Sequence, residues 1–297
     1  MRVLITGASG FIGMPLSKKL SELGCEVLGL VRSAPIESQS SIIWLEADLS
    51  FPDSYKDRIE LFRPEVLIHL AWQDIPDFSL DKSLLNLNQS LQFLSFISQI
   101  ASCRKILISG SCLEYGRVKG KCKVTDDVLP SNYFTLAKHS LRLWIESIAK
   151  EKSICLGWFR LFYVYGPGQR EESLIPSILN HLKTGSLPEI NTPLFANDYI
   201  FIDDVIDAFS IATNSSFKSG IYNLGTGKTI SVLEICRYAE QIVFNSSNLS
   251  KKIELTSKTM TPNTNFWADI SSSKEQLKWS PKVSISEGIK KSWDQFK

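Results

Sequence analysis

A glycine-rich segment near the start of the chain limits its possible folds more than any other feature. Residues 6–13 read Thr-Gly-Ala-Ser-Gly-Phe-Ile-Gly, between an apolar run at Arg2–Thr6 and a stretch of helical periodicity at Phe11–Leu23. In this context Gly7 permits a tight turn, Gly10 lets the backbone approach a pyrophosphate, and Gly13 lets the helix pack against the strand. The sequence predicts a dinucleotide site at a helix N-terminus, although a plain glycine turn would look alike. The intervening predicted contacts are Ser9, Phe11 and Ile12.

The first half of the chain alternates short apolar runs with longer amphipathic stretches, which is typical of βαβ units around a parallel sheet. The predicted strands are Arg2–Thr6, Glu26–Val31, Ile42–Glu46, Val66–Leu70, Lys105–Ser109 and Cys155–Leu161. The predicted helices are Phe11–Leu23, Leu84–Ala101 and Thr135–Lys150. We therefore expect an α/β fold, a Rossmann-type doubly wound parallel sheet of about six or seven strands, with the glycine turn at the carboxyl ends of the strands.

The alternation breaks up after Gly166-Pro167-Gly168. Helical pieces are predicted at Ser173–Lys183, Asp203–Thr213 and Val232–Phe244, and a polar surface loop is predicted at Asn245–Lys252. Turns rich in glycine, proline and asparagine separate these pieces. We interpret residues 1–165 as a dinucleotide-binding domain and residues 166–297 mainly as a smaller, substrate-binding α/β lobe.

Composition excludes several classes of protein. Of 297 residues, 43% are hydrophobic and 22% charged, and the net charge of +2 is too small to predict a nucleic-acid partner. No apolar run reaches the roughly 18 residues that a membrane span needs, so we expect a cytoplasmic protein without a membrane contact. The six cysteines form no C-x-x-C pair, so neither a metal site nor a disulfide framework is predicted.

The end of the second predicted strand indicates which dinucleotide is used. An NAD site usually has an acidic residue there to accept from the ribose 2′-hydroxyl, whereas this chain has Arg32 and Ser33. A guanidinium pairs well with a 2′-phosphate, so NADP(H) is predicted and NAD(H) is less favoured, unless Arg32 is an ordinary surface charge. Asp48 and Leu49, after the third strand, are predicted to reach the adenine, although a turn aspartate is an equally simple interpretation.

Six segments, in a fixed order, resemble the extended short-chain dehydrogenases/reductases that act on nucleotide sugars, the NAD-dependent epimerase/dehydratase family. They are the glycine segment, Ile68–Ala71, Ile108–Gly116, Arg160–Pro167, Asp198–Val205 and Tyr222–Gly227. The resemblance runs nearly end to end. It implies that residues 198–225 return to the first domain, that the protein forms a homodimer, and that further residues contact the cofactor: Leu70, Ala71, Trp72, Ser109 and Lys138.

The same resemblance implies the catalytic residues. Ser111 matches the serine that hydrogen-bonds the reacting oxygen, and Lys138 matches the lysine that lowers the pKa of a catalytic tyrosine. That tyrosine stands four residues before the lysine, where this chain has Phe134. Tyr133 comes one residue earlier, about 100° around a helix from the required face.

Two accounts of this mismatch remain open. In the first, Phe134 is an introduced replacement of the tyrosine that leaves the chain nearly inactive. In the second, the chain is natural and a local shift at the helix start brings Tyr133 to the substrate. We favour the first because Phe134 keeps the register of Leu136-Ala137-Lys138.

The substrate lobe departs from the family pattern. The family commonly holds the nucleotide diphosphate with two arginines. This chain has Asn197 at the first of these places and lacks an arginine at the second, near Ala268-Asp269. The nearest cationic substitutes are Arg170, Lys183 and Lys258. The predicted substrate contacts are Ser111, Cys112, Tyr163, Arg170 and Asn197.

The motifs are most similar to the branch that reduces nucleotide-linked 4-keto-6-deoxyhexoses with NADPH. The product would be a 6-deoxy sugar nucleotide for polysaccharide biosynthesis. Cys112-Leu113 lacks the acid/base pair that a 4,6-dehydratase needs. A nucleotide-sugar epimerase and a catalytically silent dinucleotide-binding protein remain as alternatives.

Overall fold

The computed structural model describes residues 1–35, 41–116, 119–186, 188, 190–245 and 265–295. The predicted loop at Asn245–Lys252 lies, after its first residue, outside this part of the chain, and so does Lys258. Within the described residues, no helix is long and apolar enough to cross a membrane.

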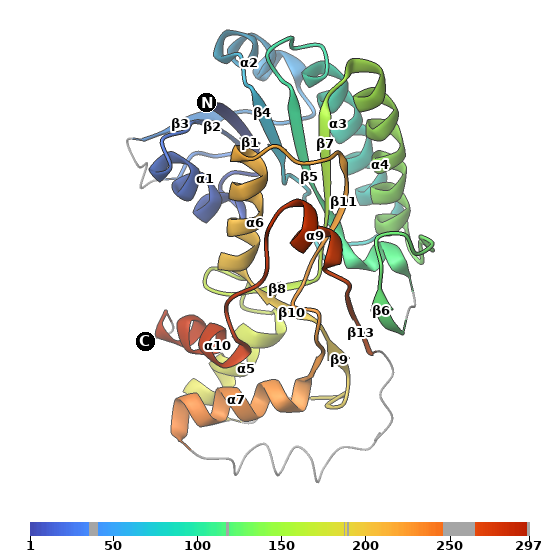
Figure 1. The fold of residues 1–297 in the computed structure, drawn as a ribbon. Helices are drawn as coiled ribbons and strands as arrows, with labels where there is room; N and C mark the ends of the chain where they lie inside the picture. The colour runs from blue at the N-terminus through green and yellow to red at the C-terminus, as the bar shows by residue number, and fades with distance from the viewer. Residues whose placement is uncertain (36–40, 117–118, 187, 189, 246–264, 296–297) are drawn as a thin grey trace.

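A seven-stranded parallel sheet forms the centre of the larger part of the molecule (Figure 1). Its order is β11-β7-β5-β4-β1-β2-β3, which confirms the predicted α/β class and strand number. The strands are β1 (Arg2–Thr6), β2 (Glu26–Val31), β3 (Ile42–Glu46), β4 (Val66–His69), β5 (Lys105–Ser111), β7 (Cys155–Leu161) and β11 (Gly220–Leu224). Every ladder between them is parallel.

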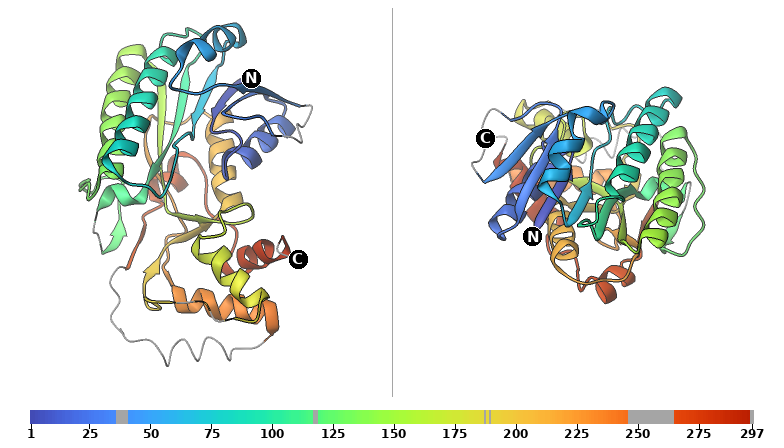
Figure 2. Two further views of the ribbon diagram at one scale, coloured as in Figure 1. Left: turned by 180° about the vertical axis from the view of Figure 1, so that it is seen from behind. Right: turned by 90° about the horizontal axis from the view of Figure 1, so that it is seen from above.

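The central strands are mostly apolar because helices cover both faces of the sheet. Val3, Leu4 and Ile5 of β1 are all fully buried, and alternate residues enter different cores: Val3 and Ile5 join one cluster and Leu4 the other. Figures 1 and 2 show the two helical layers. One contains α1 (Gly13–Glu22) and α6 (Ile202–Asn214), and the other α2 (Lys56–Phe62), α3 (Leu80–Ile97) and α4 (Tyr133–Lys152).

Helices α3 and α4 begin earlier than predicted. The second predicted helix begins at Leu80 rather than Leu84, because Ser79 is the last residue in an extended conformation. The third begins at Tyr133 rather than Thr135, because the Asn132 side chain accepts a hydrogen bond from the Thr135 N–H. In the first turn of α3, Asp81, Lys82 and Ser83 hide the apolar period from which a helix is predicted.

The smaller part is built from short strands and helices at the other end of the molecule (Figure 1). Its sheets have the orders β12-β9-β13-β6 and β10-β8. The strands are β6 (Gly120–Cys122), β8 (Tyr163–Tyr165), β9 (Ala196–Asn197), β10 (Tyr199–Phe201), β12 (Ile230–Ser231) and β13 (Asn265–Ala268). The helices are α5 (Leu174–Lys183), α7 (Val232–Phe244), α9 (Ser271–Gln276) and α10 (Ile285–Asp294), and two 3₁₀ turns, η1 (Pro52–Ser54) and η2 (Cys112–Tyr115), lie in the larger part.

The chain leaves the large sheet after β7 and later comes back to it. β11 pairs with β7 in the register Gly220↔Gly157 to Leu224↔Leu161, and α6 packs beside α1. Asp198, between β9 and β10, is fully buried. Its side chain accepts hydrogen bonds from Thr226 N, Gly227 N and Ala268 N. The two parts of the molecule are therefore joined by buried hydrogen bonds as well as by the backbone.

Candidate active site

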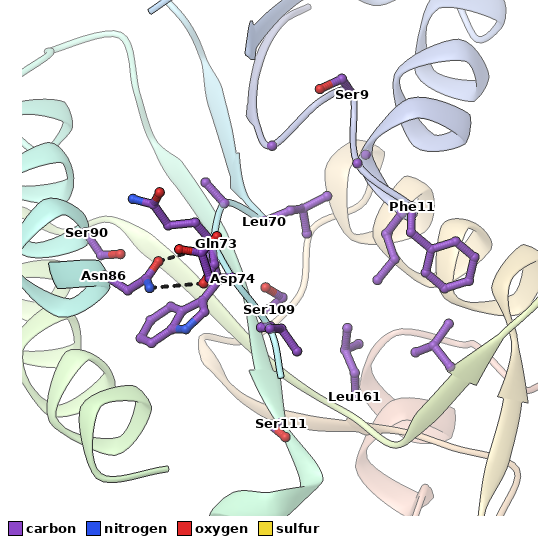
Figure 3. Close-up of a pocket in the computed structure, with 18 of the residues that line it drawn as sticks. Ser9, Phe11, Leu70, Gln73, Asp74, Asn86, Ser90, Ser109, Ser111 and Leu161 are labelled. Carbon is purple, nitrogen blue, oxygen red and sulfur yellow. Dashed lines mark hydrogen bonds between the residues drawn. The ribbon is translucent and has the colours of Figure 1, made fainter. Parts of the chain in front are cut away.

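A cavity of about 740 Å³ opens at the carboxyl ends of β1, β2, β4 and β5. From β1 the chain first adds β2 and β3 on one side and then β4 and β5 on the other, so the direction of winding changes at β1. In doubly wound sheets ligands bind at such a switch point. Figure 3 shows Ser9 and Phe11 from the glycine turn on one side of this cavity, Gln73 and Asn86 on another, and Ser109 and Ser111 along β5. The cavity therefore joins the glycine turn to the predicted catalytic strand.

The glycine turn has the geometry of a phosphate cradle. Gly7 has a φ of 69°, and a Cβ built on Gly13 would lie 2.1 Å from the Gly7 carbonyl oxygen. Any larger residue at position 13 would push the helix off the strand. Ile12 at the start of α1 makes no side-chain capping bond, and the first turn holds no acidic residue. Met14 N and Leu16 N already donate to the Gly10 and Ile12 carbonyl oxygens, and residue 15 is a proline, so an anion such as a dinucleotide pyrophosphate would be bound by the N–H groups of residues 11–13 at the start of the helix.

The predicted adenosine end of the site contains Arg32, Asp48 and Leu49, all of which line the cavity. The Arg32 guanidinium donates to the Gln73 side-chain oxygen across 3.4 Å. Ser33, which was predicted to help bind a 2′-phosphate, is exposed and does not line the cavity. The next N–H group, that of Ala34, already donates to Glu46 Oε1 at 2.9 Å.

A buried amide network, which sequence reasoning missed, supports one wall of the cavity. Gln73 and Asn86 exchange hydrogen bonds of 2.7 and 3.2 Å (Figure 3), and the Gln73 side chain donates to Gln89 at 2.8 Å. Asn86 and Gln89 are buried although both are polar. The signal was available: Asn86, Gln89 and Ser90 recur at a helical spacing on the inner face of α3.

Ser111 ends β5 inside the cavity and begins η2. Its Oγ accepts a hydrogen bond from Leu113 N at 3.2 Å, and its own N–H donates to Glu114 Oε1 at 2.8 Å. The Ser111 hydroxyl hydrogen is therefore available to a ligand oxygen. Glu114 is completely buried and also receives hydrogen bonds from Trp158 and, at 3.1 Å, from Arg160.

Lys138 reaches the cavity from the inner face of α4. Its Nζ donates to the Ser109 carbonyl oxygen at 2.9 Å and lies 4.0 Å from the centroid of the Trp72 ring. Burial lowers the pKa of Lys138 to about 7, against the opposing effect of Glu114. Behind it, burial and then the Lys138 charge lower the pKa of His69 to about 3, so that His69 is neutral at physiological pH.

Phe134, not Tyr133, faces the cavity. The Phe134 ring is 4% exposed, stacks on Phe78 at 4.8 Å between centroids, and meets the edge of Trp72 at 5.5 Å. Tyr133 is 51% exposed and lies outside the cavity lining. The cap at Asn132 fixes the start of α4, so the structure does not contain the local shift that would bring Tyr133 to a substrate.

The remaining predicted residues divide between the cavity and the core. The cavity lining includes Ser9, Gly10, Phe11, Ile12, Leu70, Ala71, Trp72, Ser109 and Arg170. Cys112, Tyr163 and Asn197, predicted as substrate contacts, do not line it. Cys112 is the first residue of η2 and packs into the core, and Asn197 is buried in β9. The Tyr163 ring instead contacts Tyr199 and Phe266.

Arg170 reaches toward the cavity from the smaller part of the molecule. Its guanidinium donates to the Ile75 carbonyl oxygen in the loop between β4 and α3. Within the described residues, no cluster of three or more His, Cys, Asp or Glu side chains could hold a metal ion. The donors available to a ligand are therefore backbone N–H groups, hydroxyls, amides, Lys138 and two arginines.

Comparison with known proteins identifies the kind of protein that has this site. The model of the NAD dependent epimerase/dehydratase family matches residues 3–225. The chain is 27% identical over 312 residues to dTDP-4-dehydro-6-deoxyglucose reductase from Escherichia coli, covering 97% of this chain and 95% of the relative.

Two solved structures show the same fold. The structure of UDP-glucose 4-epimerase from Thermotoga maritima with UDP-glucose gives a TM-score of 0.88 at 24% identity, covering 100% of this chain and 98% of that one. That of UDP-glucuronic acid 4-epimerase from Bacillus cereus, in complex with UDP-glucuronic acid and NAD, gives 0.84 at 23% identity, with 99% and 98% covered. By its sequence and by its site, the chain belongs to the NAD-dependent epimerase/dehydratase family of nucleotide-sugar-modifying enzymes.

Proposed function

We propose that this enzyme reduces the 4-keto group of a nucleotide-linked 4-keto-6-deoxyhexose with NADPH, producing a 6-deoxy sugar nucleotide. The observation that carries the proposal is one continuous cavity, lined by the glycine turn, by Arg32, and by Ser111 with Lys138. The Escherichia coli relative is named for the reduction of a dTDP-linked 4-dehydro-6-deoxyglucose, which supports this substrate class.

In this proposal the chain's own residues bind the cofactor and polarise the substrate carbonyl group. The N-terminus of α1 would hold the cofactor pyrophosphate, and Lys138 would lie near the nicotinamide end because it projects from α4 onto β5. When bound, the cofactor supplies the hydride. The Ser111 hydroxyl, whose oxygen is already held by Leu113 N, donates to the substrate carbonyl oxygen and stabilises the negative charge that develops on it.

The preference for NADPH rests on Arg32. A 2′-phosphate on the cofactor would give the Arg32 guanidinium a charged partner in place of its long hydrogen bond to Gln73. The Glu46 carboxylate, bonded to Ala34 N, faces the same turn and opposes a phosphate there. Arg32 lines the cavity whereas Glu46 does not, so we retain NADPH as the preferred cofactor.

The arrangement after Ser111 disfavours a dehydratase. Elimination of water needs an acid/base pair beside the substrate, whereas Cys112 lies in the core and Leu113 is apolar. Burial also raises the pKa of the Cys112 thiol well above its usual range. An epimerase is the second candidate, because the solved structures with this fold include 4-epimerases.

We also propose that the protein is a homodimer formed through α3 and α4. These helices pack side by side and carry exposed apolar side chains that a second copy would cover: Leu80, Leu84, Leu85, Leu136, Leu143 and Trp144. Trp144 is 61% exposed. Light scattering after gel filtration should give twice the chain mass, and Trp144→Lys should give the monomer. A monomeric unmodified protein would contradict this interface.

The activity is tested with purified protein and 4-keto-6-deoxyhexoses linked to dTDP, CDP, UDP or GDP. Loss of NADPH absorbance, with formation of the reduced sugar nucleotide by mass spectrometry, is the expected result. Ser111→Ala should lower kcat by roughly 10²-fold while NADPH binding is unchanged. Interconversion of 4-epimers by tightly retained cofactor, without net oxidation of NADPH, would establish the epimerase instead. A cofactor that binds but supports neither reaction would favour a silent dinucleotide-binding protein.

A further inference from the structure

We propose that Lys138 is the proton donor of this enzyme and passes its proton, through one water molecule, to the carbonyl oxygen held by Ser111. The inference rests on the proposed function, since it concerns the proton of the same reduction. It starts from the fact that the wall that should carry a phenol is apolar: Phe134 is stacked on Phe78 and meets Trp72.

The position of Lys138 relative to Ser111 suits such a transfer. Ser109, whose carbonyl oxygen binds Lys138 Nζ, and Ser111 are two residues apart on β5, hence about 7 Å apart along the strand. Both line the cavity. Because Lys138 Nζ is bonded at Ser109 and not at Ser111, a water molecule in the cavity is needed to bridge the ammonium and an oxygen held by Ser111. An ammonium has three N–H donors, and Ser109 uses one of them.

Other charged groups that line the cavity are less suited to the role. Asp74 is paired with Lys82 at 2.6 Å, and both side chains are 40% exposed. Asp48 accepts a hydrogen bond from Ser50 N at the adenosine end. Arg32 and Arg170 do not release protons at physiological pH. Among the described residues of the lining, Lys138 is the buried group that can lose and regain a proton.

The groups packed behind Lys138 are already engaged. His69, on β4, has Thr6 Oγ1 on one ring nitrogen at 2.8 Å and Ser90 Oγ on the other at 3.1 Å. Glu114, in η2, accepts from Ser111 N, from Trp158 and from Arg160. Neither can take the place of Lys138: His69 is neutral, and the charge of Glu114 favours the ammonium form of Lys138.

A lysine in this environment is adapted to acid catalysis near neutral pH. An ordinary lysine holds its proton too tightly to be an efficient donor, whereas burial lowers the pKa of Lys138 to about 7. In the transfer, one N–H bond of the ammonium breaks and its electron pair stays on nitrogen, while an O–H bond forms on the carbonyl oxygen through the water. The hydride supplied by the dihydronicotinamide completes the reduction, and the neutral amine regains a proton from solvent.

The first test needs no turnover. In NMR spectra of protein labelled at the lysine ε-carbons, one resonance that disappears in Lys138→Arg should titrate near pH 7, and Phe134→Tyr should keep this resonance. A resonance of Lys138 that titrates above about pH 9.5, as an ordinary lysine does, would overturn the proposal without any assay of activity.

The second test uses kcat as a function of pH. In the unmodified enzyme, kcat for reduction should fall about tenfold per pH unit above pH 7, because the donor must be protonated. Lys138→Arg keeps the positive charge but cannot deprotonate, so kcat should fall roughly 10²–10⁴-fold while the Kd of NADPH changes little. Phe134→Tyr added to Lys138→Arg should restore turnover. Lys82→Arg, at the exposed pair with Asp74, is the matched control and should behave as the unmodified enzyme.

The remaining outcomes separate the two proposals. Full activity and an unchanged pH profile in Lys138→Arg would overturn the role of Lys138 and leave the reductase intact. The same holds if the unmodified chain is inactive and Phe134→Tyr is active, since Phe134 would then be a lesion that Lys138 does not compensate. If neither chain reduces any of the sugars, the proposed function fails and this inference fails with it.

Discussion

Replacing Glu114 by glutamine should destabilise the protein far more than a surface change of the same size. Glu114 and Arg160 form an ion pair of 3.1 Å whose side chains are 0% and 1% exposed. Burial acts to lower the pKa of Arg160, but Glu114 and then Tyr115 outweigh it, so the pKa lies above its usual range and the guanidinium stays charged. In Glu114→Gln this charge remains buried without a counter-ion.

The expected cost follows from this burial. Removing one partner of a buried ion pair typically costs about 3–5 kcal/mol, because the other charge is left uncompensated. The exposed pair of Lys82 and Asp74 provides the comparison, and Lys82→Gln should cost about 0–1 kcal/mol. Glutamine can still accept from Ser111 N and Trp158, so the loss should come mainly from the contact with Arg160.

Urea unfolding followed by circular dichroism gives the free energy of unfolding of each variant. Glu114→Gln and Arg160→Met should each lose about 3–5 kcal/mol, and the double variant should lose clearly less than the sum. A loss below about 1 kcal/mol in Glu114→Gln, or strict additivity in the double variant, would refute the view that this pair is a coupled buried unit.

The remaining predictions concern the cofactor site and pH. Arg32→Asp should weaken NADPH and strengthen NADH in fluorescence titrations, and equal affinities in the unmodified protein would contradict the role of Arg32. Gly13→Ala should cost about 1–3 kcal/mol and weaken cofactor binding, because its Cβ would meet a backbone oxygen at 2.1 Å. Gly24→Ala, with a φ of 81° but nothing within 4 Å, should lose stability alone. Since burial lowers the pKa of His69 to about 3, the unfolded chain binds a proton between about pH 6.5 and 3 that the folded chain does not. Urea unfolding should therefore show stability falling as pH drops below 6.5, less so in His69→Gln, and identical slopes would disprove this.

The parts of the fold that could be predicted are those where burial imposes a long pattern. β1, β2, β3 and β7 have the predicted bounds. β1, β2 and β7 are buried on both faces and are nearly continuous apolar runs, and β3, at the edge of the sheet, still begins with four apolar residues. β9 and β12 have two residues each, and so short a run has no period. Their pairing depends on tertiary contacts such as those of Asp198, which sequence spacing does not record.

The candidate site divides in a similar way. The glycine turn is readable from sequence because its steric demands leave no other residue type at Gly13. Cys112 cannot be placed from its motif, because a motif match does not say whether the side chain after the strand turns toward the cavity or toward the core. Gln73 was overlooked because its role depends on Asn86, which reaches it from α3.

The return of β11 to the large sheet means that the dinucleotide-binding half is not a continuous stretch of chain. A polypeptide that stopped at residue 165 would contain the glycine turn and the catalytic strand, yet β7 would present an open edge of unpaired N–H and C=O groups. Such an edge can recruit strands of other molecules, so a shortened protein should aggregate. During synthesis on the ribosome, this half cannot complete its sheet until residue 224 has emerged. Segments of the smaller part that precede β11 are therefore available to fold while the larger part is still incomplete.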